Sequence, residues 1–360
     1  MSAQTVTFRK HSNNPSDVVR VIEYDSRQTE LGPEEVCIQF LAAPINPQDL
    51  LVIAGKYPVQ PAQQCEGEPI PGYDGVARVE RIGSAVTNLQ PGDQVIPRQH
   101  GLGTWRSQAV VPASSLLQVP SSHLDSVSAA LLKMGCGPAY LLLQSRQDLR
   151  PGDWVVLNAA TGVIAQMVIQ FARLRGCHSL SIIRDRDDVD STRKQLLALG
   201  ADLVVTETEL AAQGPVLAAQ KRIVLALDAV FGSSGARLAG LLTTGGTYVN
   251  YGSLGGATES IGLTQELIFW KQIKFKHFRL SQALAHFSQS QQEDLMTWFC
   301  RLFETGSLRT PAVDRVSWET GPSLEATVKQ ALQTAAPRAK QQVGVRKQVF
   351  VFGPGNQRPI

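Results

Sequence analysis

Trp154-Val155-Val156-Leu157-Asn158-Ala159-Ala160-Thr161-Gly162-Val163-Ile164-Ala165 is the stretch of sequence that decides the fold. Four apolar residues lead into a turn of small residues, after which apolar side chains recur at helical spacing as far as Arg175. This order predicts a strand, a tight turn and a helix, the first unit of a dinucleotide-binding fold. The usual G-x-G-x-x-G signature is reduced to Gly162 and Ala165, so the glycine pattern alone is a weak signal.

A second apolar run, Leu180–Ile183, is followed at once by Arg184-Asp185-Arg186. NAD-binding enzymes usually place one carboxylate at the end of this second strand, where it binds the ribose diol. Two guanidinium groups suit a 2′-phosphate instead, so the sequence predicts NADP(H) as the cofactor. The alternative is that Arg184 and Arg186 are a solvated charge pair after a strand.

The rest of the chain divides around this unit. Residues 1–125 contain short β-prone runs and turns, which predict a mostly β, partly barrel-like domain. Strand and helix patterns alternate across residues 126–285, which predicts an α/β domain with a doubly wound parallel sheet. Residues 286–360 are expected to return to the first domain and complete it. The expected parallel strands are 154–158, 179–183, 203–205, 223–227 and 247–251.

Composition narrows the class of protein further. With 360 residues, 43% of them hydrophobic and 18% charged, the chain is long enough for two globular domains. A net charge of +3 gives no reason to expect a nucleic-acid partner. The five cysteines stand singly, which argues for reduced thiols and against disulfides or a structural zinc. No stretch reaches the roughly 18–20 apolar residues of a membrane span.

Four motifs together resemble the mitochondrial trans-2-enoyl-CoA/acyl-carrier-protein reductases, zinc-free members of the medium-chain dehydrogenase/reductase superfamily. The similarity extends from about residue 5 to residue 352. The motifs are Leu41-Ala42-Ala43-Pro44-Ile45-Asn46-Pro47-Gln48-Asp49, Gly55-Lys56-Tyr57-Pro58, Gly101-Leu102-Gly103-Thr104-Trp105-Arg106 and Arg184-Asp185-Arg186.

The resemblance implies a Rossmann domain beside a GroES-like, partly open barrel. It also implies a homodimer that uses NADPH to reduce the α,β double bond of a trans-2-enoyl thioester, carried by CoA or acyl-carrier protein, in fatty acid biosynthesis. Zinc enzymes of the superfamily have a Gly-His-Glu near Gly72-Tyr73-Asp74-Gly75; since Tyr73 replaces the histidine here, no metal is expected.

The resemblance also assigns roles to single residues of the first domain. Tyr57, in the Gly-Lys-Tyr-Pro motif, matches the catalytic tyrosine of the family. A phenol suits this role, because it can donate a proton or stabilise an enolate oxygen. The alternative is that Tyr57 is a loop aromatic that packs on Pro58. Asn46 could hydrogen-bond the substrate or hold Tyr57, or it could simply form an Asn-Pro turn. Trp105 is expected to shape an apolar wall of the substrate pocket.

The expected cofactor-binding residues lie mainly in the second domain. Lys347 matches a family cofactor contact, with a solvated surface lysine as the alternative. The full set is Gly162, Val163, Ile164, Ala165, Arg184, Asp185, Arg186, Tyr251, Gly252, Ser253, Leu254, Phe278, Arg279, Leu280 and Lys347.

Four sites depart from the family pattern, the mildest being Tyr251-Gly252-Ser253-Leu254 in place of Tyr-Gly-Gly-Met. Gly135–Pro138 replaces Asn-Pro-x-Thr, Arg279 replaces a tryptophan, and Val163 stands where glycine is frequent and could hinder approach to the pyrophosphate. Two alternatives therefore stay open: a quinone or enal reductase on the same scaffold, and a non-catalytic regulatory paralogue.

The N-terminus bears on the compartment. Residues 1–14 carry Arg9 and Lys10 and no acid, as transit peptides do, but Thr5–Phe8 has the pattern of a first strand. We expect a mature or untargeted start with no clear transit peptide. The resemblance then implies the mitochondrial matrix if the source is eukaryotic, and the cytoplasm otherwise.

Overall fold

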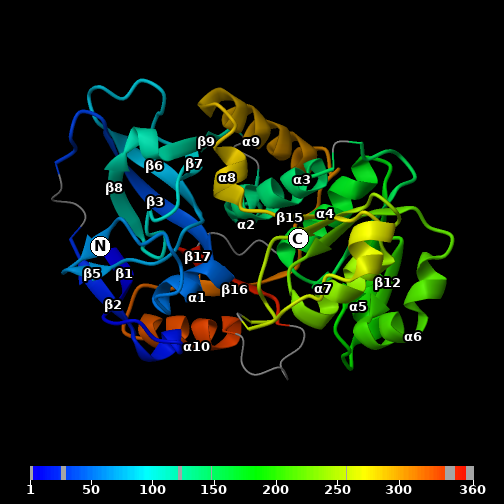
Figure 1. Cartoon of the computed structure of the whole chain (residues 1–360). Helices are drawn as coiled ribbons and strands as arrows, with labels where there is room; N and C mark the ends of the chain where they lie inside the picture. The colour runs from blue at the N-terminus through cyan, green and yellow to red at the C-terminus, as the bar shows by residue number, and fades with distance from the viewer. Residues whose placement is uncertain are drawn as a thin grey trace. The chain divides into compact units, whose positions relative to one another are not determined.

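A computed structural model describes residues 3–25, 30–120, 124–146, 148–256, 258–336 and 345–353. These residues form two compact units (Figure 1). The first unit takes its residues from Met1–Lys133, Ser290–Thr305 and Ala312–Ile360, and the second from Met134–Gln289 and Gly306–Pro311.

The second unit is built on a six-stranded sheet in which every neighbouring pair of strands is parallel. The strand order is β12-β11-β10-β13-β14-β15, so the chain moves outward on one side of β10 and then crosses to the other side. This is the doubly wound arrangement predicted from the sequence. The strands are β10 (Trp154–Leu157), β11 (His178–Ile183), β12 (Leu203–Thr206), β13 (Ile223–Asp228), β14 (Thr247–Asn250) and β15 (Lys274–His277).

Helices connect these strands and pack on the sheet (Figure 1). The apolar side of α4 (Val163–Leu174) buries Met167, Val168 and Phe171, the spacing from which the helix was predicted. Helix α3 packs on α4, and α6 packs on α7. The other helices of this unit are α3 (Gly137–Gln144), α5 (Val189–Ala198), α6 (Glu207–Ala218), α7 (Gly232–Leu241), the π-helical turn η4 (Glu266–Trp270) and α8 (Leu280–Leu284).

A seven-stranded sheet forms the core of the first unit, in the order β16-β17-β3-β6-β7-β9, with β8 also paired to β3. Strand β17 (Lys347–Phe352) lies between β3 and β16, so the apolar tail does return to this unit as expected. The other strands are β3 (Glu35–Pro44), β6 (Val76–Ile82), β7 (Gln94–Pro97), β8 (Gln108–Pro112), β9 (Leu116–Val119) and β16 (Val313–Trp318).

Shorter elements surround this sheet. Two further pairs of strands are β1 (Ala3–Phe8) with β2 (Val19–Tyr24), and β4 (Gln64–Cys65) with β5 (Glu68–Pro69). The helices of the unit are α1 (Pro47–Ile53), α2 (Ser126–Ala130), α9 (Gln289–Glu304) and α10 (Leu324–Ala335), with single turns η1 (Pro15–Asp17) and η2 (Ala113–Ser115). The π-helical turn η3 (Leu132–Cys136) contains the boundary between the two units.

The division of the chain differs in detail from the expected boundaries. Helix α2 belongs to the first unit because it packs on β3 and β6, so the boundary follows Lys133 rather than residue 125. Residues 306–311 belong to the second unit, where the Arg309 backbone is held by the Gln170 side chain through two hydrogen bonds of 2.7 and 3.0 Å. The segment 286–360, which was expected to return to the first unit as a whole, is therefore interrupted by residues 306–311 of the second unit.

Two further properties follow from the described residues. They contain no disulfide, and all five cysteines are among them. Within the described ranges, none of the helices has both the length and the apolar character that a membrane crossing requires.

Candidate active site

The expected phosphate-binding turn of the second unit joins β10 to α4. Gly162 is the N-cap of α4 and supplies no side chain, so no side chain caps this helix. The first N–H groups of the helix have no intrahelical acceptor, and together they form a site for an anion. Val163 is 7% exposed, so its branched side chain lies in the core and does not cover the turn.

The Arg184-Asp185-Arg186 segment follows β11 at the same edge of the sheet, because the carboxyl ends of parallel strands lie together. Arg184 is exposed. The Asp185 carboxylate accepts a hydrogen bond of 2.9 Å from the Thr208 hydroxyl, and threonine hydrogen bonds lower its pKa. The Arg186 guanidinium forms two hydrogen bonds of 2.5 and 3.0 Å with Asp188.

Two loops that follow β13 and β14 are joined along their length. Tyr251 N–H donates to the Asp228 carbonyl at 2.9 Å, and Leu254 N–H donates to the Ala229 carbonyl at 3.0 Å. A Cβ atom on Gly252 would lie 2.7 Å from the Ala229 carbonyl oxygen. The glycine is therefore required by the close approach of the two loops. Ser253 is exposed in the same turn.

The Phe278-Arg279-Leu280 segment leads from β15 into α8. Phe278 N–H donates to the Asn250 carbonyl at 2.9 Å, which ties this segment to the end of β14. Arg279 is exposed and Leu280 is buried, so the charge that replaces the family tryptophan faces solvent in this unit.

A buried network at the ends of β10 and β13 was missed by the sequence analysis. Asp228 is wholly buried and accepts hydrogen bonds from Asn158 Nδ2 at 2.6 Å, from the backbone of Val230 and Phe231, and from the Tyr248 hydroxyl. These donors fix the loop after β13. The sequence does contain a signal for this network. Asn158 is the polar last residue of one predicted strand, and Asp228 directly follows another.

In the first unit, the Gly55-Lys56-Tyr57-Pro58 motif ends helix α1. Gly55 has φ +70°, Gly55 N–H donates to the Val52 carbonyl, and Lys56 N–H donates to the Leu51 carbonyl. This is the Schellman pattern for which glycine is preferred. It places the half-buried ring of Tyr57 edge-on to the ring of Tyr73, with a centroid distance of 6.0 Å.

Tyr73 provides a fixed support for Tyr57. The Tyr73 ring is wholly buried, and its hydroxyl donates to the Val59 carbonyl at 2.5 Å. Its backbone N–H donates to Asp49 Oδ1 at 3.1 Å. Burial and the Asp49 charge both raise the pKa of Tyr73, so its hydroxyl remains a proton-bearing donor. The residue that replaces the zinc-binding histidine thus packs against the expected catalytic tyrosine.

Hydrogen bonds link Asn46 to Asp49 and to Lys347, and Asp49 connects this group to Tyr73. Asn46 is 7% exposed, and its backbone N–H donates to Asp49 Oδ2 at 2.7 Å. Lys347 Nζ donates to Asn46 Oδ1 at 2.7 Å and to the Ile45 carbonyl at 3.3 Å. Burial raises the pKa of Asp49 to about 7 and lowers the pKa of Lys347 to about 8. Lys347 is therefore not the solvated surface lysine considered above.

A second buried lysine, Lys133, lies near Asp74 in the first unit. Lys133, 3% exposed, donates from Nζ to the carbonyls of Pro97 and Arg98 at 2.8 Å each. Burial lowers its pKa to about 8, against the opposing effect of Asp74. His100 lies 5.8 Å from Tyr73 between ring centroids, and burial lowers its pKa to about 4.

Trp105 requires a correction. It was expected to form a wall of the substrate pocket, but it exposes none of its surface and packs edge-on against Phe350 at 5.5 Å. Its neighbour Thr104 donates from its hydroxyl to the Asp74 carbonyl at 2.7 Å. The Gly-Leu-Gly-Thr-Trp-Arg motif thus supports the turn that carries Tyr73 from within the core.

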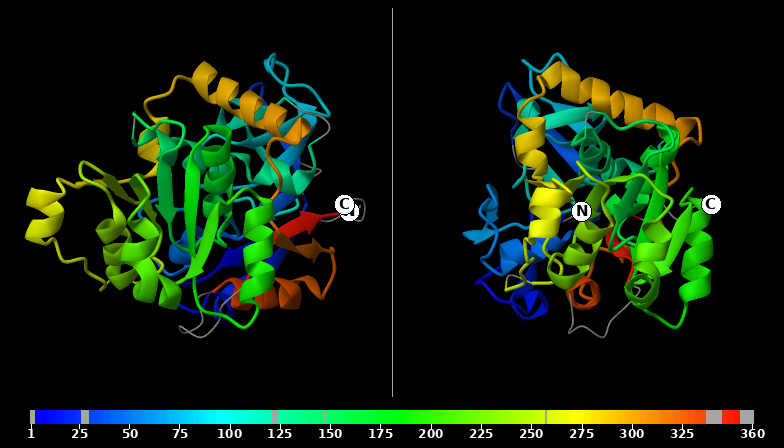
Figure 2. Two further views of the ribbon diagram at one scale, coloured as in Figure 1. Left: turned by 90° about the vertical axis from the view of Figure 1, so that its right-hand side faces the viewer. Right: turned by 45° about the vertical axis from the view of Figure 1, so that its right-hand side comes forward.

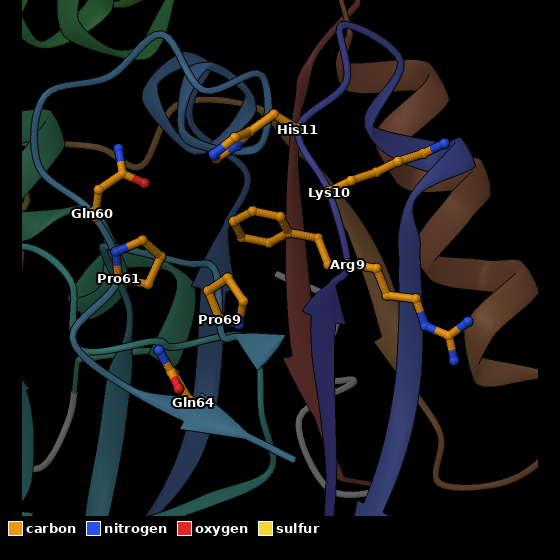
Figure 3. A pocket seen from close by; sticks show the side chains of 8 residues that line it. Arg9, Lys10, His11, Gln60, Pro61, Gln64 and Pro69 are labelled. Atoms are coloured by element: carbon orange, nitrogen blue, oxygen red, sulfur yellow. The ribbon is translucent and has the colours of Figure 1, made fainter. Parts of the chain in front are cut away.

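A pocket of about 320 Å³ is lined by residues that follow β1 and by residues of the loop after Tyr57 (Figure 3). Gln60 lines it and donates from Nε2 to the Tyr57 carbonyl at 2.7 Å. His11 and Pro69 also line it (Figure 3). Among the described residues of the whole chain, no group of three or more His, Cys, Asp or Glu side chains could hold a metal ion.

Comparison with known proteins shows the family to which the chain belongs. Residues 32–121 match the alcohol dehydrogenase GroES-like domain. The chain is 37% identical to the human protein "Enoyl-[acyl-carrier-protein] reductase, mitochondrial" over 329 residues, which cover 89% of this chain and 84% of the human one. The chain belongs to the mitochondrial enoyl-[acyl-carrier-protein] reductase family.

Solved structures of reductases show the same fold. A structure described as the Etr1p/NADP/crotonyl-CoA complex superposes with a TM-score of 0.87 at 24% identity, covering 98% of this chain and 100% of that chain. The Etr1p/Etr2p heterodimer of the mitochondrial 2-enoyl thioester reductase from Candida tropicalis gives 0.86 at 24% identity, with the same coverage. The enoyl-[acyl-carrier-protein] reductase family therefore accounts for both units of the chain.

Proposed function

We propose that this chain is an NADPH-dependent reductase of trans-2-enoyl thioesters. The observation that carries the proposal is Tyr57, which the helix-ending motif of α1 sets against the buried ring of Tyr73 in a chain of this reductase family. Asn46 and Lys347 supply polar groups in the same unit. The fold and the family set the reaction class, and these residues support the mechanism.

The residues of the second unit fit a dinucleotide phosphate. Helix α4 begins without a side-chain cap, which leaves its first N–H groups for an anion. Arg184 and Arg186 supply guanidinium groups beyond β11, the chemistry that a 2′-phosphate requires. The joined loops at Tyr251–Leu254 and the Phe278–Leu280 segment would complete the site. When bound, NADPH supplies the hydride that reduces the double bond.

The protein's own residues have two tasks in this reaction. The thioester oxygen gains negative charge as the double bond is reduced, and a hydrogen-bond donor must stabilise it. The α-carbon must then receive a proton from an acid. We assign Tyr57 to proton donation or to enolate stabilisation, and Asn46 to substrate binding. The buried ring of Tyr73 excludes water from one side of Tyr57.

The decisive test compares wild type with Tyr57→Phe. NADPH oxidation would be followed optically with trans-2-enoyl-CoA substrates of several chain lengths, with NADH as the control cofactor. We expect the variant to lose at least about 100-fold in turnover, the usual effect of losing a general acid, and to keep its affinity for NADPH. Unchanged turnover would reject the role of Tyr57.

A panel of quinones and small enones separates the alternatives. Turnover of these acceptors alone, insensitive to Tyr57→Phe, would indicate a quinone or enal reductase. NADPH binding with no turnover of any acceptor would indicate a regulatory paralogue.

The oligomeric state forms a second part of the proposal. The segment between β14 and β15 exposes five large apolar side chains, four of them between residues 263 and 270, and β15 is an edge strand. In the left view of Figure 2, its yellow helical turn stands out from the green helices of the second unit. Exposed apolar groups beside a free strand edge are typical of an interface. We infer a homodimer through Leu263, Ile268, Phe269 and Trp270.

The carrier and the compartment follow from the relatives' names. They are enoyl-[acyl-carrier-protein] reductases described as mitochondrial. We infer that acyl-carrier protein and CoA thioesters are both accepted, and that a eukaryotic form works in the mitochondrial matrix.

A further inference from the structure

We propose that Lys347 is a positioning residue, which locks the Asn46 side chain so that its Nδ2 atom is free to donate a hydrogen bond to the thioester carbonyl oxygen. The inference rests on the proposed function, and it gives Asn46 a specific role within it. Lys347 acts through Asn46 and not through the substrate.

The first observation is an unused donor. Asn46 is only 7% exposed, and its Nδ2 atom is buried. This atom has no hydrogen-bond partner among the described residues. Buried polar atoms are nearly always paired in folded proteins, so an unpaired donor in a residue held by the same carboxylate as Tyr73 points to a missing ligand atom. That atom must accept a hydrogen bond, as a carbonyl or enolate oxygen does.

The second observation fixes which end of the amide is unpaired. The ammonium of Lys347 can only donate hydrogen bonds, so the atom of Asn46 that it contacts at 2.7 Å must be the oxygen. The Nδ2 atom therefore takes the opposite direction. Without Lys347 the amide could turn over, and its oxygen would then face an acceptor.

The third observation shows that both residues are held by the backbone. Asn46 lies two residues after the end of β3, and Lys347 begins the neighbouring strand β17. Ile45 N–H donates to the Gln348 carbonyl at 2.9 Å, which joins the residues next to this pair. Asp49 holds the Asn46 N–H at 2.7 Å and the Tyr73 N–H at 3.1 Å. The donor is thus preorganised in the frame that supports Tyr57.

Asn46→Asp is the sharpest variant, because it keeps an oxygen for Lys347 and removes the Nδ2 donor without changing the size of the side chain. We expect kcat for enoyl-CoA to fall about 100-fold, the usual effect of losing one oxyanion donor, with a smaller change in KM. NADPH affinity, measured by fluorescence titration, should stay within about twofold of wild type. Wild-type turnover by Asn46→Asp would overturn the inference.

A double-mutant cycle tests Lys347. We expect Lys347→Met to lower kcat by about 10- to 100-fold through misplacement of the amide. The double variant Asn46→Ala with Lys347→Met should be no slower than Asn46→Ala alone, because both changes remove one interaction. Multiplied losses, or an NADPH affinity reduced more than tenfold in Lys347→Met, would make Lys347 an independent cofactor contact and overturn the proposal.

Two controls keep the outcome interpretable. Lys329→Met removes a surface lysine of α10 that pairs with Glu325, and it should leave kcat unchanged. Thermal unfolding of each variant identifies loss of fold, and Asn46→Asp still decides if Lys347→Met does not fold. If wild type itself reduces no enoyl thioester, the proposed function fails; if wild type is active and Asn46→Asp is equally active, only this inference fails.

Discussion

At the scale of single residues, the cofactor preference depends on which groups the arginines after β11 already contact. Both oxygens of Asp188 engage the guanidinium of Arg186. A 2′-phosphate bound here, as proposed, must therefore compete with Asp188 for Arg186.

Asp188→Asn should release Arg186 and strengthen NADPH binding. We expect the Kd for NADPH to fall by up to about fivefold, the effect of one partly exposed ion pair, with the Kd for NADH unchanged. Fluorescence titration with both cofactors measures this difference. Asp190→Asn, which changes a carboxylate that is 92% exposed, is the matched control. Weaker NADPH binding by Asp188→Asn would mean that Asp188 orients Arg186 for the phosphate.

His100 should make the protein less stable in acid. Burial lowers its pKa to about 4, so between about pH 6.5 and pH 4 the unfolded chain binds a proton that the folded chain does not. The free energy of unfolding therefore falls as pH falls through this window. His100→Phe retains a ring beside Tyr73 and should flatten that dependence in urea unfolding at pH 7, 5.5 and 4.5. The exposed His286→Phe serves as control, and an unchanged slope in His100→Phe would contradict the prediction.

At the scale of elements, the loops after β13 and β14 behave as one piece. Their backbones are joined by hydrogen bonds, and Gly252 permits the approach. The Asp228 carboxylate accepts hydrogen bonds from two backbone N–H groups of the first loop and so fixes its conformation. A change that separates them should affect stability and cofactor binding together.

Gly252→Ala tests this coupling. Its Cβ would overlap the Ala229 carbonyl, so we expect a loss of about 1–3 kcal/mol in the free energy of unfolding, together with weaker NADPH binding. Urea unfolding and fluorescence titration measure the two effects. Gly262→Ala is the control, since a Cβ there meets nothing within 4 Å. Loss of stability with unaltered NADPH affinity would show that the loop pair lies outside the cofactor site.

Elements were predicted well where the information is local. The strands β10 to β14 lie within a residue or two of their predicted positions, because each is a short apolar run bounded by turn residues. Helix α2 was assigned to the wrong side of the boundary, since no local pattern shows which sheet a five-residue helix covers. Trp105 was misplaced for the same reason: a motif shows that a tryptophan is present, and packing decides whether it faces a pocket.

At the scale of the whole molecule, the exposed apolar segment between β14 and β15 predicts self-association. Phe269 and Trp270 are 62% and 63% exposed, an unusual state for large apolar side chains in a monomer. We expect the wild-type protein to sediment as a dimer and the double variant Phe269→Glu with Trp270→Glu to sediment as a monomer.

Leu197→Glu is the matched control for this experiment, because Leu197 is 47% exposed on α5. It should sediment like wild type. A dimer that persists in the double variant would exclude this segment as the interface.

Long-range contacts set the limit of the sequence analysis. Tyr57 could be singled out from its motif, but its packing partner Tyr73 was considered only as a missing metal ligand. Lys347 and Asn46 are 301 positions apart, and no spacing rule connects them. Their contact exists because β17 enters the sheet next to β3.

That strand order has a consequence for synthesis on the ribosome. All residues of the second unit precede β17 in the chain, so this unit can fold before β17 has paired with β3. Until the return strand emerges, Ala42–Pro44 of β3 and the whole of β16 lack their partner strand, although β6 and β8 already pair with the rest of β3. A nascent chain arrested before Lys347 would thus display a finished second unit and an incomplete first unit, a species for chaperones to protect. Lys347, proposed above to orient Asn46, lies in the strand that pairs with Ala42–Pro44, so its contact with Asn46 can form only after this strand has left the ribosome.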